Sequence, residues 1–151
     1  METKIDIRKY ATSDYDEILK LLRLNTPGFF ALSEEVDLID FLNHHIEYYY
    51  VVEVENEIVA CGGFNFSGDF SVGKISWDII NPDFQGRGIG SLLLRYRIEK
   101  LKEFGHVKTI SVRTSQLVYK FYEKNGFRLT EIIKDYWADG FDLYNMEYDG
   151  R

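Results

Sequence analysis

The chain has 151 residues, enough for one domain over residues 1–151 with a substantial buried core. A content of 45% hydrophobic and 28% charged residues excludes disordered and fibrous classes, and the net charge of −7 argues against a nucleic-acid partner. Cys61 is the only cysteine and no apolar run approaches the roughly 18 residues that span a bilayer, so we expect a cytoplasmic protein with no membrane partner.

The first third of the chain predicts one strand and two helices. Ile5 to Lys9 alternates as a short strand. Ser13 is placed as the N-cap of a helix that ends before Pro27. A second helix is expected after Ser33, with acidic residues in its first turn, and it should run to about His45.

The middle of the chain predicts three strands in an antiparallel meander. They cover Tyr48 to Val54, Glu57 to Phe66, and Val72 to Ile80. The turns between them, at 55–56 and 67–69, are too short for parallel crossovers.

The last part alternates helices and strands. Ser91 to Phe104 predicts a helix ended by Gly105, and the later elements are a strand at 108–112, a helix at 117–124 and strands at 127–133 and 141–148. The fold class is therefore α+β, with one β-α-β crossover near the middle.

The segment from Asn81 to Ser91 carries the strongest chemical signal. Glycines at 86, 88 and 90 allow sharp turns and remove side chains that would keep a ligand away from the backbone. The segment leads directly into a helix, whose first N–H groups are free and whose dipole is positive. This arrangement predicts a site for phosphate oxygens, to which Arg87 can add a charged contact.

A glycine-rich loop before a helix has three other interpretations. A nucleoside-triphosphate P-loop needs a Lys after its last glycine, but Ser91 follows Gly90 here. A dinucleotide-binding loop has the spacing G-x-G-x-x-G, whereas this loop has G-x-G-x-G. A simple connector without a ligand stays open, although three alternate glycines are costly in chain entropy.

Two segments resemble the GCN5-related N-acetyltransferase (GNAT) family. Gln85-Gly86-Arg87-Gly88-Ile89-Gly90, preceded by Ile80-Asn81-Pro82, is similar to the family signature Q/R-x-x-G-x-G/A. Phe121-Tyr122-Glu123-Lys124-Asn125-Gly126-Phe127 is similar to a second family segment. Both lie in the family's order and spacing, and the expected elements fit the family from Ile5 to Tyr148.

The resemblance implies a GNAT-like fold, with a central mixed, mostly antiparallel, splayed sheet flanked by helices, and acetyl-CoA as co-substrate. The backbone of the strand before the signature would pair with the pantetheine arm, and the loop amides would hold the pyrophosphate. Ser115 stands where many members have an asparagine that contacts the pantetheine, so that contact is weakened here. The cofactor-binding residues expected are Ile79, Ile80, Gln85, Gly86, Arg87, Gly88, Ile89, Gly90, Ser91 and Ser115.

Two residues are catalytic candidates. The resemblance implies that Tyr122 faces the thioester sulfur, where a phenol can protonate the leaving thiolate; the alternative is a tyrosine packed under the sheet. Strand period two places Lys74, Ser76 and Asp78 on one face, with the intervening residues on the other. Asp78 would lie near the splayed end and could accept the amine proton, pin a loop, or bind a cationic substrate.

The remaining glutamate, histidine and cysteine candidates are better explained by roles in the fold than in catalysis or metal binding. Glu34 and Glu35 could line the acceptor cleft, but helix N-terminal charge explains them better. Adjacent His44 and His45 point in different directions on a helix, so no metal site is predicted. Cys61 is expected to pack in a strand rather than carry an acetyl group.

The acceptor site is predicted from two connections that the family places around its substrate channel. Their residues are Phe29 and Phe30 in the first, and Asp135, Tyr136 and Trp137 in the second. Aromatic rings with carboxylates suit a cationic amine. The alternative is that the rings close the core and the acids are solvated.

The predicted function is transfer of an acetyl group from acetyl-CoA to a primary amine, on a small molecule or a peptide, by direct attack in a ternary complex. A non-catalytic CoA-binding or interaction module of the same fold is the alternative. The family's frequent dimers make a homodimer an open possibility.

Overall fold

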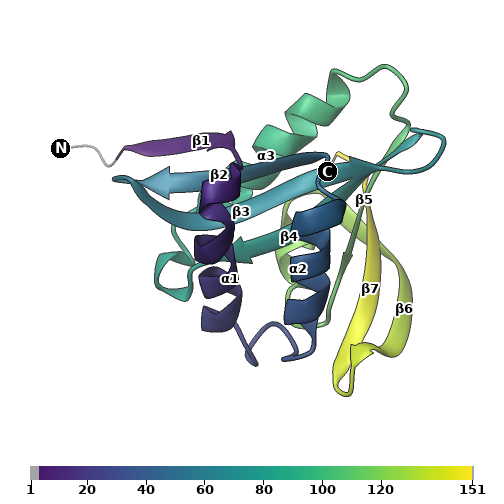
Figure 1. The fold of residues 1–151 in the computed structure, drawn as a ribbon. Coiled ribbons are helices and arrows are strands. Elements are labelled where there is room, and N and C mark those ends of the chain that lie inside the picture. The colour runs from purple at the N-terminus through teal and green to yellow at the C-terminus, as the bar shows by residue number, and fades with distance from the viewer. Residues whose placement is uncertain (1–3, 151) are drawn as a thin grey trace.

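A computed structural model describes residues 4–150 as a seven-stranded sheet with helices on both faces (Figure 1). The strand order is β1-β2-β3-β4-β5-β7-β6, and every neighbouring pair is antiparallel except β4 with β5. The α+β class, the meander and the single central crossover are thereby confirmed. The strands are β1 Ile5–Lys9, β2 Tyr48–Val54, β3 Glu57–Phe66, β4 Val72–Ile80, β5 Thr109–Thr114, β6 Phe127–Ala138 and β7 Phe141–Tyr148.

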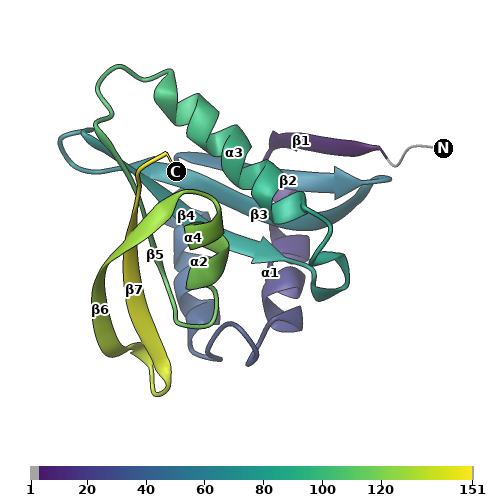
Figure 2. The same ribbon diagram turned by 180° about the vertical axis from the view of Figure 1, so that it is seen from behind.

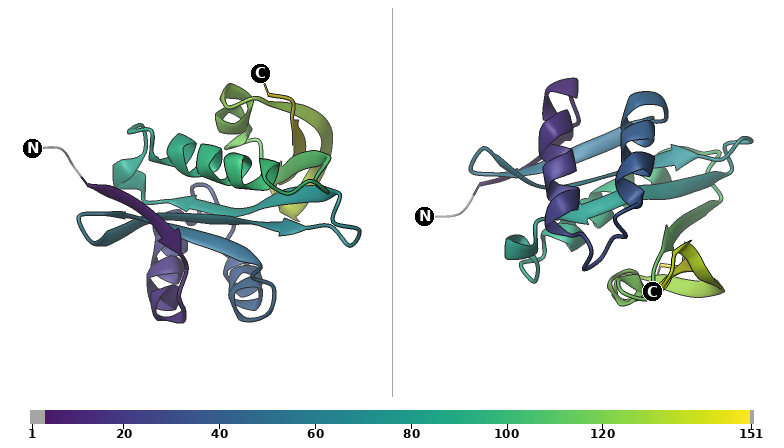
Figure 3. Two further views of the ribbon diagram at one scale, coloured as in Figure 1. Left: turned by 90° about the horizontal axis from the view of Figure 1, so that it is seen from above. Right: turned by 60° about the horizontal axis from the view of Figure 1, so that its bottom comes forward.

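The helices divide between the two faces of the sheet (Figures 2 and 3). α1 (Tyr15–Leu24) and α2 (Glu34–His44) cover one face, and α3 (Ile89–Lys102) and α4 (Tyr119–Lys124) lie on the other. Each side has its own apolar core, because the strands between them are buried on both faces. Short 3₁₀ turns, Thr12–Asp14 and Pro82–Phe84, precede α1 and the glycine loop.

Several predicted boundaries move by a few residues. The carboxylate of Asp14 accepts the Ala11 N–H at 2.8 Å, so the chain makes a 3₁₀ turn first and α1 begins later than the predicted Ser13 cap. α3 begins at Ile89 rather than Ser91 and ends at Lys102 without using Gly105 as its cap. The predicted turn at Glu55-Asn56 has φ values of 50° and 68°, the pattern of a tight hairpin.

The sheet opens between β4 and β5. Their parallel ladder joins Val72–Ile75 to Thr109–Val112 and extends no further. β4 continues to Ile80 against β3 alone, and β5 continues to Thr114 against β7. The two central strands therefore separate in the middle of the molecule, as the resemblance implied.

A β-bulge changes which face the end of β4 presents. Cys61 pairs with Ile79 and Gly63 with Ser76, so two residues of β4, Trp77 and Asp78, oppose one residue of β3. Trp77 has φ of 47°.

The prediction that residues 75, 77 and 79 share a face is therefore wrong. Ile75 packs in the α3-side core, whereas Trp77 and Ile79 pack on the α1–α2 side. Asp78 consequently turns toward α3 and α4, on the side of Ile75.

Candidate active site

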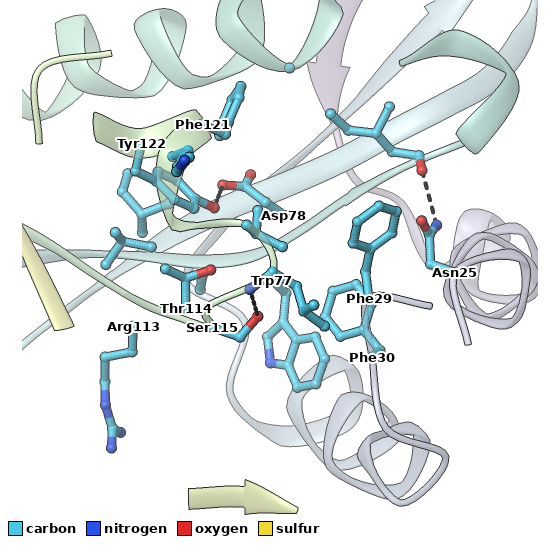
Figure 4. Close-up of a pocket in the computed structure, with 18 of the residues that line it drawn as sticks. Asn25, Phe29, Phe30, Trp77, Asp78, Arg113, Thr114, Ser115, Phe121 and Tyr122 are labelled. Carbon is cyan, nitrogen blue, oxygen red and sulfur yellow. Dashed lines mark hydrogen bonds between the residues drawn. The ribbon is translucent and has the colours of Figure 1, made fainter. Parts of the chain in front are cut away.

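A cleft of about 1010 Å³ occupies the opening between β4 and β5. Figure 4 shows Asp78 and Tyr122 near its centre, with Asn25, Phe29 and Phe30 on one side and Arg113 pointing away from Tyr122. The cleft has two halves. We call the part beside the glycine loop and α4 the cofactor half, and the part beside α2 and the 25–33 loop the acceptor half.

The glycine loop has the conformation that an anion site needs. Gly86 and Gly88 have φ of 78° and 80°, and a Cβ at either position would meet nothing within 4 Å. Gly88 is the N-cap of α3, so the first N–H groups of that helix have no partner within it, and Ile89 to Ser91 line the cleft. Gly90 has a different reason to be glycine, because a Cβ there would run into Ile80 and the ring of Phe121. The cradle fits a phosphate group.

Most of the predicted cofactor residues line this cleft. Ile79 does not, because its side chain is 1% exposed in the α1–α2 core. Arg87 does not line it either, and its guanidinium lies 4.8 Å from the ring centroid of Phe84. The residues that do line the cleft are Ile80, Gln85, Gly86, Gly88, Ile89, Gly90, Ser91 and Ser115.

Two of the lining residues already make hydrogen bonds within the protein. The Ile80 carbonyl accepts a hydrogen bond from the Asn25 side-chain amide at 2.9 Å. Ser115 is buried, and its hydroxyl oxygen accepts the Leu117 N–H at 3.2 Å, which shapes the turn into α4.

The centre of the cleft holds a buried three-residue network. The Tyr122 hydroxyl donates to Oδ2 of Asp78, and Nη2 of Arg97 donates to Oδ1 of the same carboxylate. Arg97 is fully buried, and its other nitrogens donate to the carbonyls of Leu93 at 3.2 Å and Gly63 at 3.0 Å. Both carboxylate oxygens of Asp78 are therefore engaged, and every donor nitrogen of Arg97 has an acceptor.

The sheet is shaped to accept this network. A Cβ at Gly62 would collide with the carboxylate of Asp78 and the guanidinium of Arg97, so only glycine leaves room there. On the opposite face the buried Tyr49 hydroxyl donates to the Trp77 carbonyl at 2.8 Å and holds the bulge. The bulge thus fixes the position of Asp78.

Burial changes the acidity of two groups near the cleft. Loss of water, together with the adjacent negative charge of Asp78, raises the pKa of Tyr122 well above its usual 10, so the phenol is protonated at neutral pH. Burial raises the pKa of the Cys61 thiol to about 12. Cys61 is therefore a packed thiol and a poor nucleophile.

The acceptor half is built by the 25–33 loop and by Trp77. The carbonyl of buried Asn25 accepts the N–H groups of Phe29 and Phe30, at 2.8 and 3.2 Å. Phe30 stacks on Trp77 with ring centroids 6.1 Å apart. Phe29 and Phe30 both line the cleft, where the resemblance placed them.

The second predicted connection, at the β6–β7 hairpin, brings no carboxylate into the cleft, so the expected site for a cationic amine does not form there. The carboxylate of Asp135 accepts the Gly140 N–H at 2.8 Å, and its own N–H donates to Asp142, so these acids close the β6–β7 hairpin. Tyr136 is 46% exposed and lies outside the cleft lining. Trp137 does line the cleft, and its Nε1 donates to the Thr114 carbonyl at 3.1 Å.

The remaining candidates have structural partners. The Glu34 carboxylate borders the cleft and accepts the Ala31 N–H at 2.7 Å, and burial raises its pKa. His44 and His45 do not point apart as expected, because both rings reach the carboxylate of Asp40 at 3.0 Å. Within residues 4–150, no group of three or more His, Cys, Asp and Glu residues is arranged to hold a metal.

Sequence reasoning missed two kinds of residue. Arg97 lies four residues from both Leu93 and Leu101, on the buried side of α3, and a charge in an apolar stripe signals a buried partner. Asn25 gave no such signal, because its contacts depend on the tertiary fold. Four cations also line the cleft, and their convergence depends on which faces of β4, β5 and α4 meet in the fold. They are Lys74, Arg113, Lys120 and Lys124.

Comparison of the sequence with known protein families identifies its family. The sequence matches the acetyltransferase (GNAT) family over residues 15–127. The chain belongs to that family. This confirms the resemblance drawn from the glycine loop and the Tyr122 segment.

Individual relatives cover most of the chain. An N-alpha-acetyltransferase from Sulfurisphaera tokodaii is 27% identical over 93% of this chain and 90% of its own length. An amino-acid acetyltransferase from Pseudomonas fluorescens is 30% identical over 96% of this chain, which spans 32% of that longer protein. The fold also matches N-acetylglutamate synthase from Neisseria gonorrhoeae, solved with coenzyme A and N-acetyl-glutamate, with a TM-score of 0.76, 18% identity, and coverage of 100% of this chain and 36% of that one.

The protein is therefore an acetyltransferase, and acetyltransferases of this family use acetyl-CoA. Among residues 4–150, no helix has the length and apolar character that crossing a bilayer requires.

Proposed function

We propose that the protein moves the acetyl group of acetyl-CoA to a primary amine by direct attack, with both substrates bound in one cleft. The observation that carries this proposal is the opening between β4 and β5, which joins the glycine loop to an aromatic acceptor half through Tyr122 and Asp78. Holding both reactants in one cleft supplies much of the rate, because the attack becomes effectively unimolecular.

The cofactor half would hold the phosphates of the co-substrate. The N–H groups at the start of α3, opened by the positive φ of Gly86 and Gly88, are the proposed pyrophosphate donors. Lys120 and Lys124 of α4 line the same half and supply positive charge. The side chain of Arg87 is left without a part in binding, although its backbone N–H belongs to the loop.

Tyr122 and Asp78 would move protons as a pair. Asp78 accepts a proton from the attacking amine, and Tyr122 gives its hydroxyl proton to the leaving sulfur. The proton on Asp78 then passes to the Tyr122 oxygen along the hydrogen bond that already joins them. An N–C bond forms, a C–S bond breaks, and both residues end as they began.

Arg97 is a positioning residue in this scheme. It touches neither substrate, but its two-sided contact with Asp78 and the Gly63 carbonyl fixes the carboxylate beneath Tyr122. Charge-assisted bonds of this kind are stronger than neutral ones, so they hold the carboxylate in one orientation.

Steady-state kinetics with detection of the free CoA thiol tests the proposal. The acceptors would be amino acids, short peptides with free N-termini, polyamines and aminoglycosides. We expect thiol release only with an amine present, and intersecting initial-velocity lines when both substrates are varied. Parallel lines would indicate an acetyl-enzyme intermediate. Acetyl-CoA binding by calorimetry without thiol release from any acceptor would favour the non-catalytic alternative.

A further inference from the structure

The sign of the charge that lines the cleft is opposite to that of the whole chain. The protein has a net charge of −7, yet the Lys and Arg residues that line the cleft outnumber its lining carboxylates. The cations are Lys74, Arg113, Lys120 and Lys124, and the carboxylates are Glu34 and Asp78. A cationic cleft in an acidic protein attracts anions and concentrates them locally.

The lining carboxylates are already neutralised or bonded. Asp78 is paired with Arg97 and accepts the Tyr122 hydroxyl. Glu34 accepts the Ala31 N–H, and its raised pKa reflects a carboxylate that has lost water rather than gained a cation. Within residues 4–150, none of the ion pairs includes Lys74, Arg113, Lys120 or Lys124. The chain therefore pairs none of these four cations with a carboxylate within the described residues.

The four cations divide between the two halves. Lys120 and Lys124 lie on α4, where phosphates of the co-substrate account for them. Lys74 lies on β4 and Arg113 on β5. The co-substrate gives no reason for a second cationic pair.

Strand geometry puts Lys74 and Arg113 on the acceptor side. Ile75 pairs with Val112, and both side chains pack in the α3-side core. Side chains alternate along a strand, so Lys74 and Arg113, the immediate neighbours of that pair, point to the face covered by α2.

The surroundings of the Arg113 guanidinium are aromatic. The Arg113 guanidinium lies 4.9 and 5.7 Å from the ring centroids of Tyr136 and Trp137, and Figure 4 shows it directed away from Tyr122. These rings hold the guanidinium without consuming its N–H donors. Trp77 and Phe30 form a stacked apolar wall in the same half.

We propose that the amine acceptor carries a carboxylate, which Lys74 and Arg113 bind while Trp77 and Phe30 contact its apolar part. This proposal rests on the proposed acetyl transfer, and it reverses the cationic acceptor that the sequence led us to expect. Two sources supply such a carboxylate: a free amino acid, or a peptide with an acidic residue close to its N-terminus.

Matched pairs of acceptors test the carboxylate directly. The first arm compares free amino acids such as phenylalanine and leucine with their α-carboxamides. The second arm compares amidated peptides that differ only by Glu or Gln at the second residue. We expect kcat/KM for thiol release to favour the acid over its amide by about 10–100-fold in one arm, the scale of hydrogen bonds to a charged group. The arm that responds identifies the source.

Charge-removing variants test which residues bind it. Lys74→Met and Arg113→Gln should each lower kcat/KM for the acid about 10–100-fold, leave the amide nearly unchanged, and leave the KM for acetyl-CoA unchanged. Lys20→Met and Arg95→Gln remove the same charges from exposed positions outside the cleft lining and should change neither. Thermal melts establish that all four variants fold.

The outcomes separate this proposal from the proposed function. If amides react as well as acids, or if the variants slow both equally, the carboxylate site is overturned while acetyl transfer stands. If no acceptor releases thiol, acetyl transfer fails, and calorimetry of the same acid and amide pairs with the CoA-bound protein then decides the carboxylate site alone. Equal binding of acid and amide there would overturn it.

Discussion

The two halves of the cleft are built from the chain in different ways. The phosphate-binding part of the cofactor half is continuous in sequence, because Ile80 to Ser91 supplies the loop and the start of α3, and α4 adds Lys120 and Lys124. The acceptor half is assembled from distant segments, including Phe30, Lys74, Arg113 and Trp137. A site made by local backbone conformation can be identified from a short pattern, whereas one made by strand faces and loop contacts depends on the whole fold. The network of Tyr122, Asp78 and Arg97 lies where the halves meet.

Because the two halves are built separately, substitutions in each should change the kinetics of one substrate only. The largest effect is expected at the network of Tyr122, Asp78 and Arg97, where the halves meet. Tyr122→Phe removes the proposed proton donor and keeps the ring, so kcat should fall by about 10²–10⁴-fold. The KM for each substrate should change little, since neither half loses a binding contact. Measurement of kcat and both KM values over pH 6–10 checks this. An unchanged kcat and pH profile would leave Tyr122 as a packing residue.

The support beneath the junction should matter for stability as well. Arg97→Met leaves the Asp78 carboxylate buried without its cation, and removing one partner of a buried pair typically costs about 3–5 kcal/mol of unfolding free energy. Arg97→Met combined with Asp78→Asn should recover part of that loss, because no unpaired charge remains. Urea denaturation of the two variants measures the difference. Equal stability of both variants would mean that the unpaired Asp78 carboxylate costs no stability.

The cofactor half can be broken without touching the acceptor half. Gly88→Val places a branched side chain where φ is 80° and fills the open space above the α3 amides. We expect acetyl-CoA affinity to fall at least ~10-fold, while the KM of the amine stays unchanged. Gly105→Val is the matched control, since a Cβ there also meets nothing within 4 Å and its φ is not positive. Calorimetry that finds equal CoA binding in both folded variants would contradict the phosphate cradle.

The same contrast explains what could be predicted from the sequence. The meander, the crossover and the glycine loop follow from turn chemistry and periodicity, which act over a few residues. Strand alternation predicts that Asp78 shares a face with Lys74 and Ser76, but the bulge opposite Gly62 turns it to the other face. No pattern of a few residues indicates that bulge. The sequence gives the negative charge of Asp135 but not its hydrogen bond with the Gly140 N–H, so it suggests a ligand for a cation where the structure has a turn.

The smallest expected effect is a difference in the pH dependence of stability between two neighbouring glutamates at the start of α2. Burial raises the pKa of Glu34, which borders the acceptor half, whereas the ion pair with Arg23 at 2.8 Å lowers the pKa of the partly exposed Glu35. The folded protein therefore holds the Glu34 proton more tightly than the unfolded chain does. The stability of the wild type relative to Glu34→Gln should fall as pH rises from the ordinary pKa of 4.5.

Glu35 should show the opposite dependence. Its carboxylate stabilises the fold above pH 4.5, and that contribution is lost as pH falls through the lowered pKa of the folded state. At pH 7 we expect Glu34→Gln to melt at most ~4 °C above the wild type, since its amide oxygen can still accept the Ala31 N–H. Glu35→Gln should melt at or slightly below the wild type, because surface ion pairs contribute little. Melting curves from pH 3.5 to 8 measure both trends, and parallel trends for the two variants would contradict the burial of Glu34 as the cause.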